Sequence, residues 1–284
     1  MAKRISMSQF KSSIRQAERA INNYNRAVRK YNSDVKRAVS TYNTEVRRYN
    51  STVRHNRQII QRELAKLNSA SRSPQYHVYR TTIATMQHHY NNVISIYDDG
   101  FPVTPDQEHI LNIIEQEQAH SLITANAVLN DTVCDETGTD VEISEKLGAI
   151  SIDLMNRWKG AVFSINPQNP DAARHFCTSA RELFTEFIEM MAPDHSVFEF
   201  NPHAEKTERG NATRREKIKY MMRNTDMDDC IAEFADADIS NIVELFSVLS
   251  NATHGAAGKY EFQKLVQVKH RVERGVNFLC TLCA

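Results

Sequence analysis

The sequence predicts an all-α protein, and three observations support this fold class. Gly and Pro are scarce, with 8 and 7 residues among 284, so few residues that break helices interrupt the chain. Apolar residues recur in steps of three and four over long stretches, which is the spacing of an amphipathic helix. Long β-branched runs, which are typical of strands, are few. We expect three regions: a long helix in residues 1–72, a helical hairpin with an acidic linker in 73–141, and a helical bundle in 142–284.

The first region is expected to be a coiled coil. Apolar residues alternate steps of four and three from Phe10 to Leu67, and no Pro or Gly interrupts residues 8–69. Two successive steps of four around Val35 and Val39 form a stutter, which locally unwinds a left-handed supercoil. Because a single helix of this length with a narrow apolar stripe needs a partner, we expect a homodimer formed through this coiled coil.

The same region is strongly basic. Residues 1–72 carry 17 Lys and Arg against 4 Asp and Glu, so their net charge is +13 and that of the remaining chain is −13. Four tyrosines of the apolar stripe are each followed by Asn: Tyr24, Tyr31, Tyr42 and Tyr49. The pattern fits a packed Tyr/Val seam, a surface that presents Tyr and Arg to nucleic acid, or a helix that docks on the acidic remainder. We expect the basic residues to be spread around the helix, which weakens interpretations in which the helix lies in a groove of nucleic acid.

The second region is expected to fold back on the long helix as an antiparallel pair of helices. Thr104 and Gln107 form a capping box at the start of its second helix, with Pro105 at the first helical position. Glu117 and His120 share a helix face in that helix, as in carboxylate-bridged di-iron sites. Such sites need a second Glu-x-x-His motif, which is absent, so we expect exposed polar residues here and no metal site.

The third region is expected to be an up-and-down bundle of four long helices and a short one. The first helix is expected over about 142–165, and a polar loop is expected over 193–212. Arg174, Thr178 and Arg181 form one stripe on the second helix, which suits a phosphate or salt bridges to neighbouring glutamates. A basic patch opens the short helix, where free backbone N–H groups also favour an anion; it consists of Arg214, Arg215, Lys217 and Lys219.

Asn251-Ala-Thr-His254-Gly255 lies at the junction before the last helix. His254 could act as a general acid or base near neutral pH, assisted by the amide of Asn251. The alternative is a helix C-cap in which Gly255 is left-handed and His254 interacts with the helix dipole. The residues alone leave both interpretations open.

This junction and its bundle resemble HEPN domains, many of which are metal-independent RNases. Five further motifs resemble the predicted pPIWI-associating nuclease family of prokaryotic conflict systems: Arg157-Trp-Lys-Gly-Ala161, Asn169-Pro-Asp171, Ser179-Ala-Arg-Glu182, Thr213-Arg-Arg215 and Thr253-His-Gly255. The resemblance covers residues 150–284 and leaves the coiled coil outside. It implies an endoribonuclease in which His254 handles a proton and an arginine stabilises the charged transition state.

One residue departs from the pattern. Active HEPN RNases carry Arg before the Asn, where this chain has Ser250. The resemblance therefore implies either that Arg181 or Arg214 supplies the charge from another helix, or that the domain does not catalyse a reaction. Active bundles often pair so that both histidines face one cleft, and a parallel coiled coil would favour that pairing.

These observations give two expectations for function. The first is a homodimeric RNA endonuclease of an anti-phage defence or toxin system, which uses no cofactor and has a partner protein from its operon. The alternative is a non-catalytic sensor or adaptor that binds nucleic acid or a partner effector. The chain has no apolar run long enough for a membrane span and no secretory signal at its start, and its five Cys residues are sparse, so we expect a cytoplasmic protein.

Overall fold

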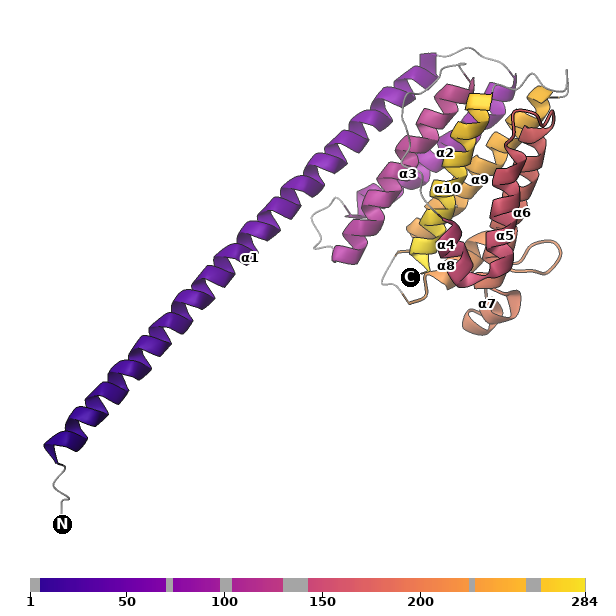
Figure 1. Ribbon diagram of the computed structural model, residues 1–284. Helices are drawn as coiled ribbons and strands as arrows, with labels where there is room; N and C mark the ends of the chain where they lie inside the picture. The colour runs from indigo at the N-terminus through magenta and orange to yellow at the C-terminus, as the bar shows by residue number, and fades with distance from the viewer. Residues whose placement is uncertain are drawn as a thin grey trace. The chain divides into compact units, whose positions relative to one another are not determined.

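The computed structural model describes residues 6–69, 74–97, 104–129, 143–224, 228–253 and 262–283. Apart from an isolated bridge between Lys206 and Ala212, the regular structure in these ranges is helical (Figure 1). The predicted all-α fold is therefore confirmed. The helices are α1 (Met7–Ser69), α2 (Pro74–Tyr97), α3 (Pro105–Leu129), α4 (Ser144–Ile150), α5 (Ile152–Ser164), α6 (Ala172–Met191), α7 (Asp194–Phe200), α8 (Arg214–Met221), α9 (Asp229–Thr253) and α10 (Phe262–Leu282).

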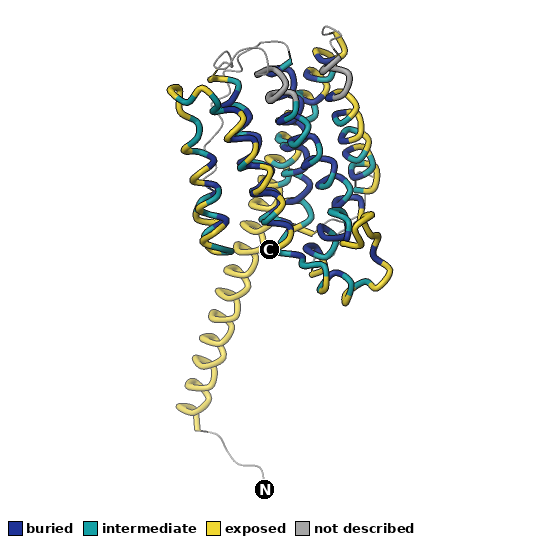
Figure 2. The backbone as a smooth tube through the Cα atoms, turned by 90° about the vertical axis from the view of Figure 1, so that its right-hand side faces the viewer, coloured by how far each residue is buried: buried dark blue, intermediate teal, exposed yellow. Residues whose placement is uncertain are grey.

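The chain divides into two compact units, residues 1–54 and residues 55–284. The first unit consists of the amino-terminal part of α1, and the predicted long helix is confirmed. Figure 2 colours this part of the helix as exposed. Its apolar side chains are included: Val28 and Val35 are 38% and 42% exposed, and Tyr24 and Tyr31 are 70% and 69% exposed. The seam of the expected coiled coil is thus uncovered in the single chain.

The second unit has one core to which the hairpin and the bundle both contribute. α2 packs mainly against α9, and α3 packs against α10. The last turns of α1 also belong to this core, where Ile60 and Leu67 are buried. Asn126 on α3 donates from Nδ2 to the carboxylate of Glu63 at 2.9 Å. The expected hairpin therefore lies against the end of α1 and against the bundle.

Local capping explains where several helices begin. The predicted box at α3 is confirmed, since the backbone N–H of Thr104 donates to Gln107 Oε1 at 2.9 Å and Gln107 N–H donates to Thr104 Oγ1 at 3.3 Å. The single helix expected over 142–165 is wrong. Ser151 has extended backbone angles and its hydroxyl accepts from Asp153 N–H, so it ends α4 and caps α5.

The loop expected over 193–212 also contains a helix, since α7 occupies Asp194–Phe200. The rest of this loop leads to Thr213. The Thr213 hydroxyl accepts from Glu216 N–H and caps the start of α8, as the sequence predicts.

Helices α6, α9 and α10 meet closely at Gly275. A Cβ atom added to Gly275 would lie 2.6 Å from Cδ1 of Ile242 on α9 and 3.4 Å from Phe184 on α6. Phe234 and Phe278 pack edge to face with ring centroids 5.9 Å apart. These contacts fix the register of α9 against its two neighbours.

Candidate functional site

The register of α6 against α9 determines which candidate residues come together. Phe184 lies beside Ile242 near Gly275, and the guanidinium of Arg181 lies 6.0 Å from the ring centroid of Phe246. Moving back along α6 therefore corresponds to moving forward along α9, so the two helices are antiparallel. Figure 1 shows the start of α6 and the end of α9 at the same end of the bundle.

This register brings the predicted stripe on α6 to the carboxyl end of α9. Arg174 is seven residues before Arg181, and Thr253 is seven residues after Phe246, so both steps cover about 10 Å of helix. Arg174, Thr178 and Arg181 are all exposed. Arg174 pairs with Asp171 at 2.5 Å.

The predicted basic patch on α8 lies elsewhere. Arg214 pairs with Asp236 at 2.6 Å and also donates to the hydroxyl of Ser240, six residues before Phe246 on α9. Six residues of helix span about 9 Å. Arg215 pairs with Glu205 at 2.5 Å. Arg181 of the stripe on α6 and Arg214 of the patch on α8 therefore contact different turns of α9.

The two lysines of α8 are also held by carboxylates. Lys217 is buried, with 3% of its side chain exposed, and pairs with Glu189 at 2.5 Å and Asp194 at 3.0 Å. Lys219 pairs with Asp229 at 2.7 Å. Burial alone would lower the pKa of Lys219, but the hydrogen bond to Asp229 together with the negative charges of Asp229 and Glu216 raises it. A phosphate reaching this patch would have to displace carboxylates.

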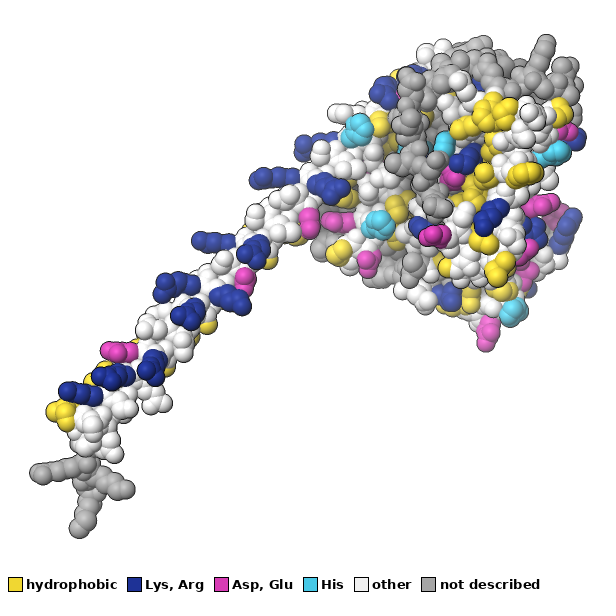
Figure 3. All heavy atoms as spheres, viewed as in Figure 1, with side chains coloured by type: hydrophobic (Ala, Val, Ile, Leu, Met, Phe, Trp, Pro, Cys, Tyr) yellow, Lys and Arg dark blue, Asp and Glu magenta, His cyan; other side chains and the backbone are white. Residues whose placement is uncertain are grey.

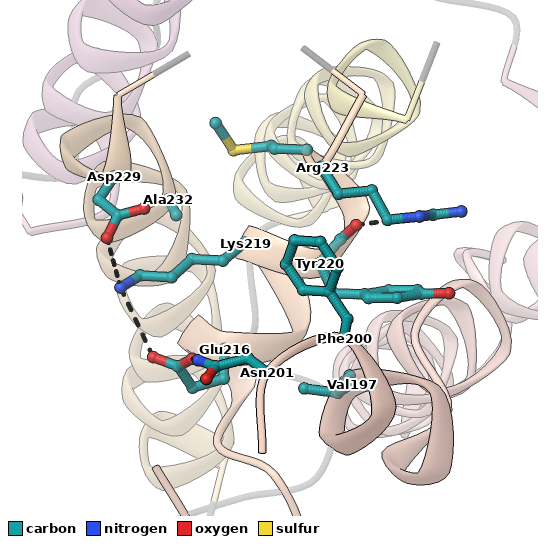
Figure 4. Close-up of a pocket in the computed structure, with 10 residues that line it drawn as sticks. Val197, Phe200, Asn201, Glu216, Lys219, Tyr220, Arg223, Asp229 and Ala232 are labelled. Carbon is teal, nitrogen blue, oxygen red and sulfur yellow. Dashed lines mark hydrogen bonds and ion pairs between the residues drawn. The ribbon is translucent and has the colours of Figure 1, made fainter. Parts of the chain in front are cut away.

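A pocket of about 390 Å³ adjoins this patch between α7, α8 and the start of α9. Phe200 and Tyr220 pack edge to face on one side of it, with centroids 5.8 Å apart. Arg223 lies over the Tyr220 ring at 4.1 Å. Lys219 reaches across the pocket from α8 to Asp229 (Figure 4). The pocket thus has an aromatic wall and two cations that already have partners.

A buried ionic cluster joins α3, α9 and α10. Arg271 is 1% exposed, and its guanidinium donates to Glu117 Oε2 at 2.5 Å and to Asp238 Oδ1. Beside it, the hydroxyls of Tyr79 and Ser121 donate to Asn241 Oδ1 at 3.1 and 2.7 Å. These contacts tie the hairpin to the bundle through its interior.

Burial shifts the protonation of this cluster. It raises the pKa of Glu117 to about 7, against the opposing effect of the Arg271 charge. Burial also raises the pKa of Asp238. The pKa of His120 falls to about 3 because of burial and the positive charges of Arg274 and Arg271.

The expectation that Glu117 and His120 are exposed polar residues is therefore wrong. Glu117 is 3% exposed, and its partner Arg271 comes from a helix 154 residues further along the chain. In the part of the chain that the structure describes, no group of three or more His, Cys, Asp or Glu side chains is arranged to hold a metal ion.

The junction with the predicted catalytic residues Asn251 and His254 lies where the described part of α9 ends. His254 lies outside the described residues and follows directly on Thr253, the last residue of α9. Asn251 lies in the last turn of α9, and its side chain, like that of Ser250, is outside the described part. Of the predicted catalytic residues, Arg181 is the one whose side chain is described.

Comparison with known proteins agrees with the sequence motifs. The described residues define an all-helical bundle that carries exposed arginines beside the end of α9. Residues 147–279 match the family model for the predicted pPIWI-associating nuclease, which confirms the resemblance. No curated protein and no solved structure gives a significant match to the chain. Among the described helices, none has the length and apolar character to cross a bilayer.

The sequence interpretation missed the cluster around Arg271, although a signal was present. Val268, Val272 and Val276 mark the buried face of α10, and Arg271 falls on that face at helical spacing. A charged residue on an apolar face needs a buried partner, and the partners come from helices that spacing alone cannot identify.

Proposed function

We propose that the chain is an RNA endonuclease that cleaves without a metal ion at the junction after α9. The antiparallel register of α6 and α9 carries this proposal. It brings Arg174, Thr178 and Arg181 alongside the final turns of α9, immediately before His254. The family match supports a nuclease in this part of the chain.

The proposed chemistry is transfer of a phosphodiester within RNA. His254 takes the proton from a 2′-hydroxyl or gives one to the leaving 5′-oxygen, and Asn251 orients the reacting hydroxyl. The 2′-oxygen bonds to phosphorus while the bond to the 5′-oxygen breaks. Arg181 stabilises the charge that develops on the phosphorane, because its exposed guanidinium lies beside α9.

The remaining cations are proposed to hold neighbouring phosphates. Arg174 and Thr178 present a guanidinium and a hydroxyl on one face, as phosphate binding requires. Arg214 and Arg215 are both half-buried and could exchange their carboxylate partners for phosphate. Lys217, which we also assign to this set, would have to release two carboxylates from a buried position.

The biological setting is part of the same proposal. The family description names an association with pPIWI proteins, which supports a role in prokaryotic antiviral defence or as a toxin, with a partner protein from the same operon. The exposed seam of α1 supports a homodimer formed through a coiled coil. We place the protein in the cytoplasm and assign it no cofactor.

The test compares wild-type protein with His254→Ala and a matched His203→Ala control, because His203 is exposed. Each is incubated with total RNA, tRNA, and single- and double-stranded DNA, in EDTA or Mg²⁺. The proposal expects RNA cleavage in EDTA by wild type and His203→Ala, and none by His254→Ala. Cleavage by His254→Ala would contradict the assignment of the catalytic residue, and cleavage only with Mg²⁺ would contradict the metal-independent mechanism.

A second candidate function is a non-catalytic sensor or adaptor. Ser250 stands where active relatives of the HEPN type carry Arg, and the described cations of α8 are already paired with carboxylates. This function expects RNA or DNA binding without turnover, weakening steeply between about 50 and 200 mM salt. Cleavage that depends on His254 would exclude it.

A further inference from the structure

The Tyr-Asn pairs of α1 belong to a longer repeat that the proposed nuclease site does not use. The pattern Tyr-Asn-x-x-Val followed by two basic residues occurs at 24–30, 31–37 and 42–48, and a fourth copy at 49–55 ends in Arg54-His55. Four residues, 38–41, separate the second copy from the third. Corresponding residues in successive copies are therefore 7, 11 and 7 positions apart.

The continuous helix aligns these copies along one face. At about 100° per residue, 7 and 11 residues correspond closely to two and three full turns. The basic pairs of the first three copies consequently lie on one line: Arg29-Lys30, Lys36-Arg37 and Arg47-Arg48. Each pair lies about 10 or 16 Å from the next along the axis.

The basic residues are confined to one sector of the helix, so the expectation that they are spread around it is wrong. All eleven Lys and Arg between Lys11 and Arg54 fall within about 120° of arc, centred about 150° from the Tyr/Val seam. The other residues in this sector are Ser, Thr, Asn and Glu18, with no apolar residue among them. Figure 3 shows the basic side chains along α1. We call this sector the basic face.

Within the described residues 6–54, the basic face has no ion pairs that would neutralise its charge. None of the Lys and Arg side chains in the described residues 6–54 forms an ion pair, whereas Arg57, Arg157 and Arg214 in the second unit each pair with a carboxylate. Residues 1–54 carry 13 Lys and Arg and 3 Asp and Glu, a net charge of +10. An uncompensated line of charge attracts an extended anion.

We propose that the basic face binds the phosphodiester backbone of nucleic acid. This contact is separate from the proposed catalytic site: it extends that function by adding a second contact with the substrate, but it does not depend on catalysis. Guanidinium and ammonium groups in a line match the regular charge of a phosphate backbone. The polar side chains between them suit the wet interfaces of protein–nucleic acid complexes.

The position of the basic face argues against a membrane. An amphipathic helix on a bilayer buries its apolar side and keeps its basic residues near the headgroups. Here the basic face lies nearly opposite the seam, so burying Val28 and Val35 in lipid would turn the charges away from the surface. A protein partner is also disfavoured, since the sector lacks the apolar and aromatic residues enriched at the centre of such interfaces.

The test measures binding of fluorescein-labelled 30-nucleotide RNA and DNA, single- and double-stranded, by fluorescence anisotropy at 50–200 mM NaCl. All proteins carry His254→Ala, so that RNA is not cut. One variant changes all six residues of the three basic pairs to Gln. A smaller pair of variants compares Arg47→Gln/Arg48→Gln with Lys159→Gln/Arg209→Gln, which removes two exposed charges from the second unit.

The proposal expects the six-residue variant to lose at least tenfold in affinity at 100 mM salt. Its slope of log affinity against log salt should fall by about 4 for single strands. The Arg47/Arg48 variant should weaken binding more than its control. Unchanged affinity in the six-residue variant, or equal losses in the two double variants, would overturn the proposal. So would stronger binding to vesicles with 30% phosphatidylserine than to every nucleic acid. Circular dichroism checks that α1 stays helical.

The same proteins separate this proposal from the proposed nuclease. If the six-residue change, made without His254→Ala, abolishes tight binding but leaves cleavage of a short RNA intact, both proposals are supported. If wild type binds through the basic face and cuts nothing, the basic face stands and the nuclease fails. If wild type cuts RNA and the six-residue variant binds equally well, the nuclease stands and the basic face fails.

Discussion

The guanidinium of Arg271 lies 2.5 Å from the carboxylate of Glu117, and both side chains are almost completely buried. Asp238 accepts a second hydrogen bond from the same guanidinium. Two carboxylates and one arginine therefore share the interior of the second unit, and this ionic cluster joins a helix of the hairpin to two helices of the bundle.

Arg271→Met should destabilise the fold strongly, because it leaves two buried carboxylates without their cation. Removing one partner of a buried ion pair costs about 3–5 kcal/mol. Urea unfolding followed by circular dichroism measures the change. Replacing all three residues, with Glu117→Met and Asp238→Leu added, should recover most of the loss, since an apolar substitute carries no desolvation penalty. A single Arg271→Met that unfolds like wild type would show that the cluster carries no such role.

Folding stability should be greatest between about pH 4.5 and 6.5. The pKa of Glu117 is raised from 4.5 to about 7, so between these pH values the folded chain keeps a proton that the unfolded chain releases. The contribution of Glu117 to stability is therefore lost as pH rises from 4.5 to about 7. The pKa of His120 is lowered from 6.5 to about 3, so its contribution to stability is lost as pH drops from 6.5 to about 3. Between pH 4.5 and 6.5 the two contributions change in opposite directions and offset each other, which leaves a plateau of stability.

Urea midpoints measured from pH 4 to 8 check this profile. Glu117→Gln cannot ionise, so only the His120 contribution remains, and stability should rise up to about pH 6.5 and stay level above it. His120→Gln leaves only the Glu117 contribution, so stability should fall from about pH 4.5 to 7 and show no loss on the acid side. A wild-type midpoint that still rises above pH 7 would contradict the assignment.

Gly275→Ala should destabilise the bundle, whereas Gly160→Ala should not. The new Cβ at Gly275 would meet Ile242 Cδ1 at 2.6 Å, and the site at Gly160 has no atom within 4 Å. Overpacking costs about 1–3 kcal/mol, while Ala in a helix gains up to about 1 kcal/mol over Gly. Thermal unfolding compares the two variants. Adding Ile242→Val to Gly275→Ala should restore the stability of the bundle, because it removes the methyl group that the new Cβ would meet.

Val28→Asp should dissociate the proposed dimer, because it places a charge in the seam. Val28 is 38% exposed in the single chain, and a paired helix would bury it. Light scattering after size exclusion measures the mass. Ser33→Asp is the control, since it adds the same charge on the basic face. If both variants keep the mass of wild type, the seam does not hold the copies together.

The sequence predicts the helices best where a local signal marks their ends. Thr104 with Gln107, and Thr213, place the starts of α3 and α8 correctly because a capping residue bonds within its own first turn. The break at Ser151 was missed since Ile150 and Leu154 continue the apolar spacing across it. Periodicity reports which face is buried and is insensitive to one residue that leaves the helix.

For the candidate site, too, the sequence predicts what lies within one helix but not the contacts between helices. Arg174, Thr178 and Arg181 can be recognised from spacing, because they share one helix. That Arg181 lies beside Phe246, and that Arg271 joins Glu117, depends on how distant helices pack. Residue spacing within a helix gives no information on that packing.

The four residues between the second and third repeats of α1 also limit how two copies could pair. Two paired helices whose seven-residue repeats are uninterrupted can shift past each other by one repeat, and only the seam layers at the two ends lose their partners. With residues 38–41 inserted, the same shift places a four-residue spacing of seam residues on one helix opposite a three-residue spacing on the other, in the middle of the seam. Only one alignment in each orientation then keeps the Tyr and Val layers matched throughout, so the insertion would select a single register while leaving the line of basic pairs straight.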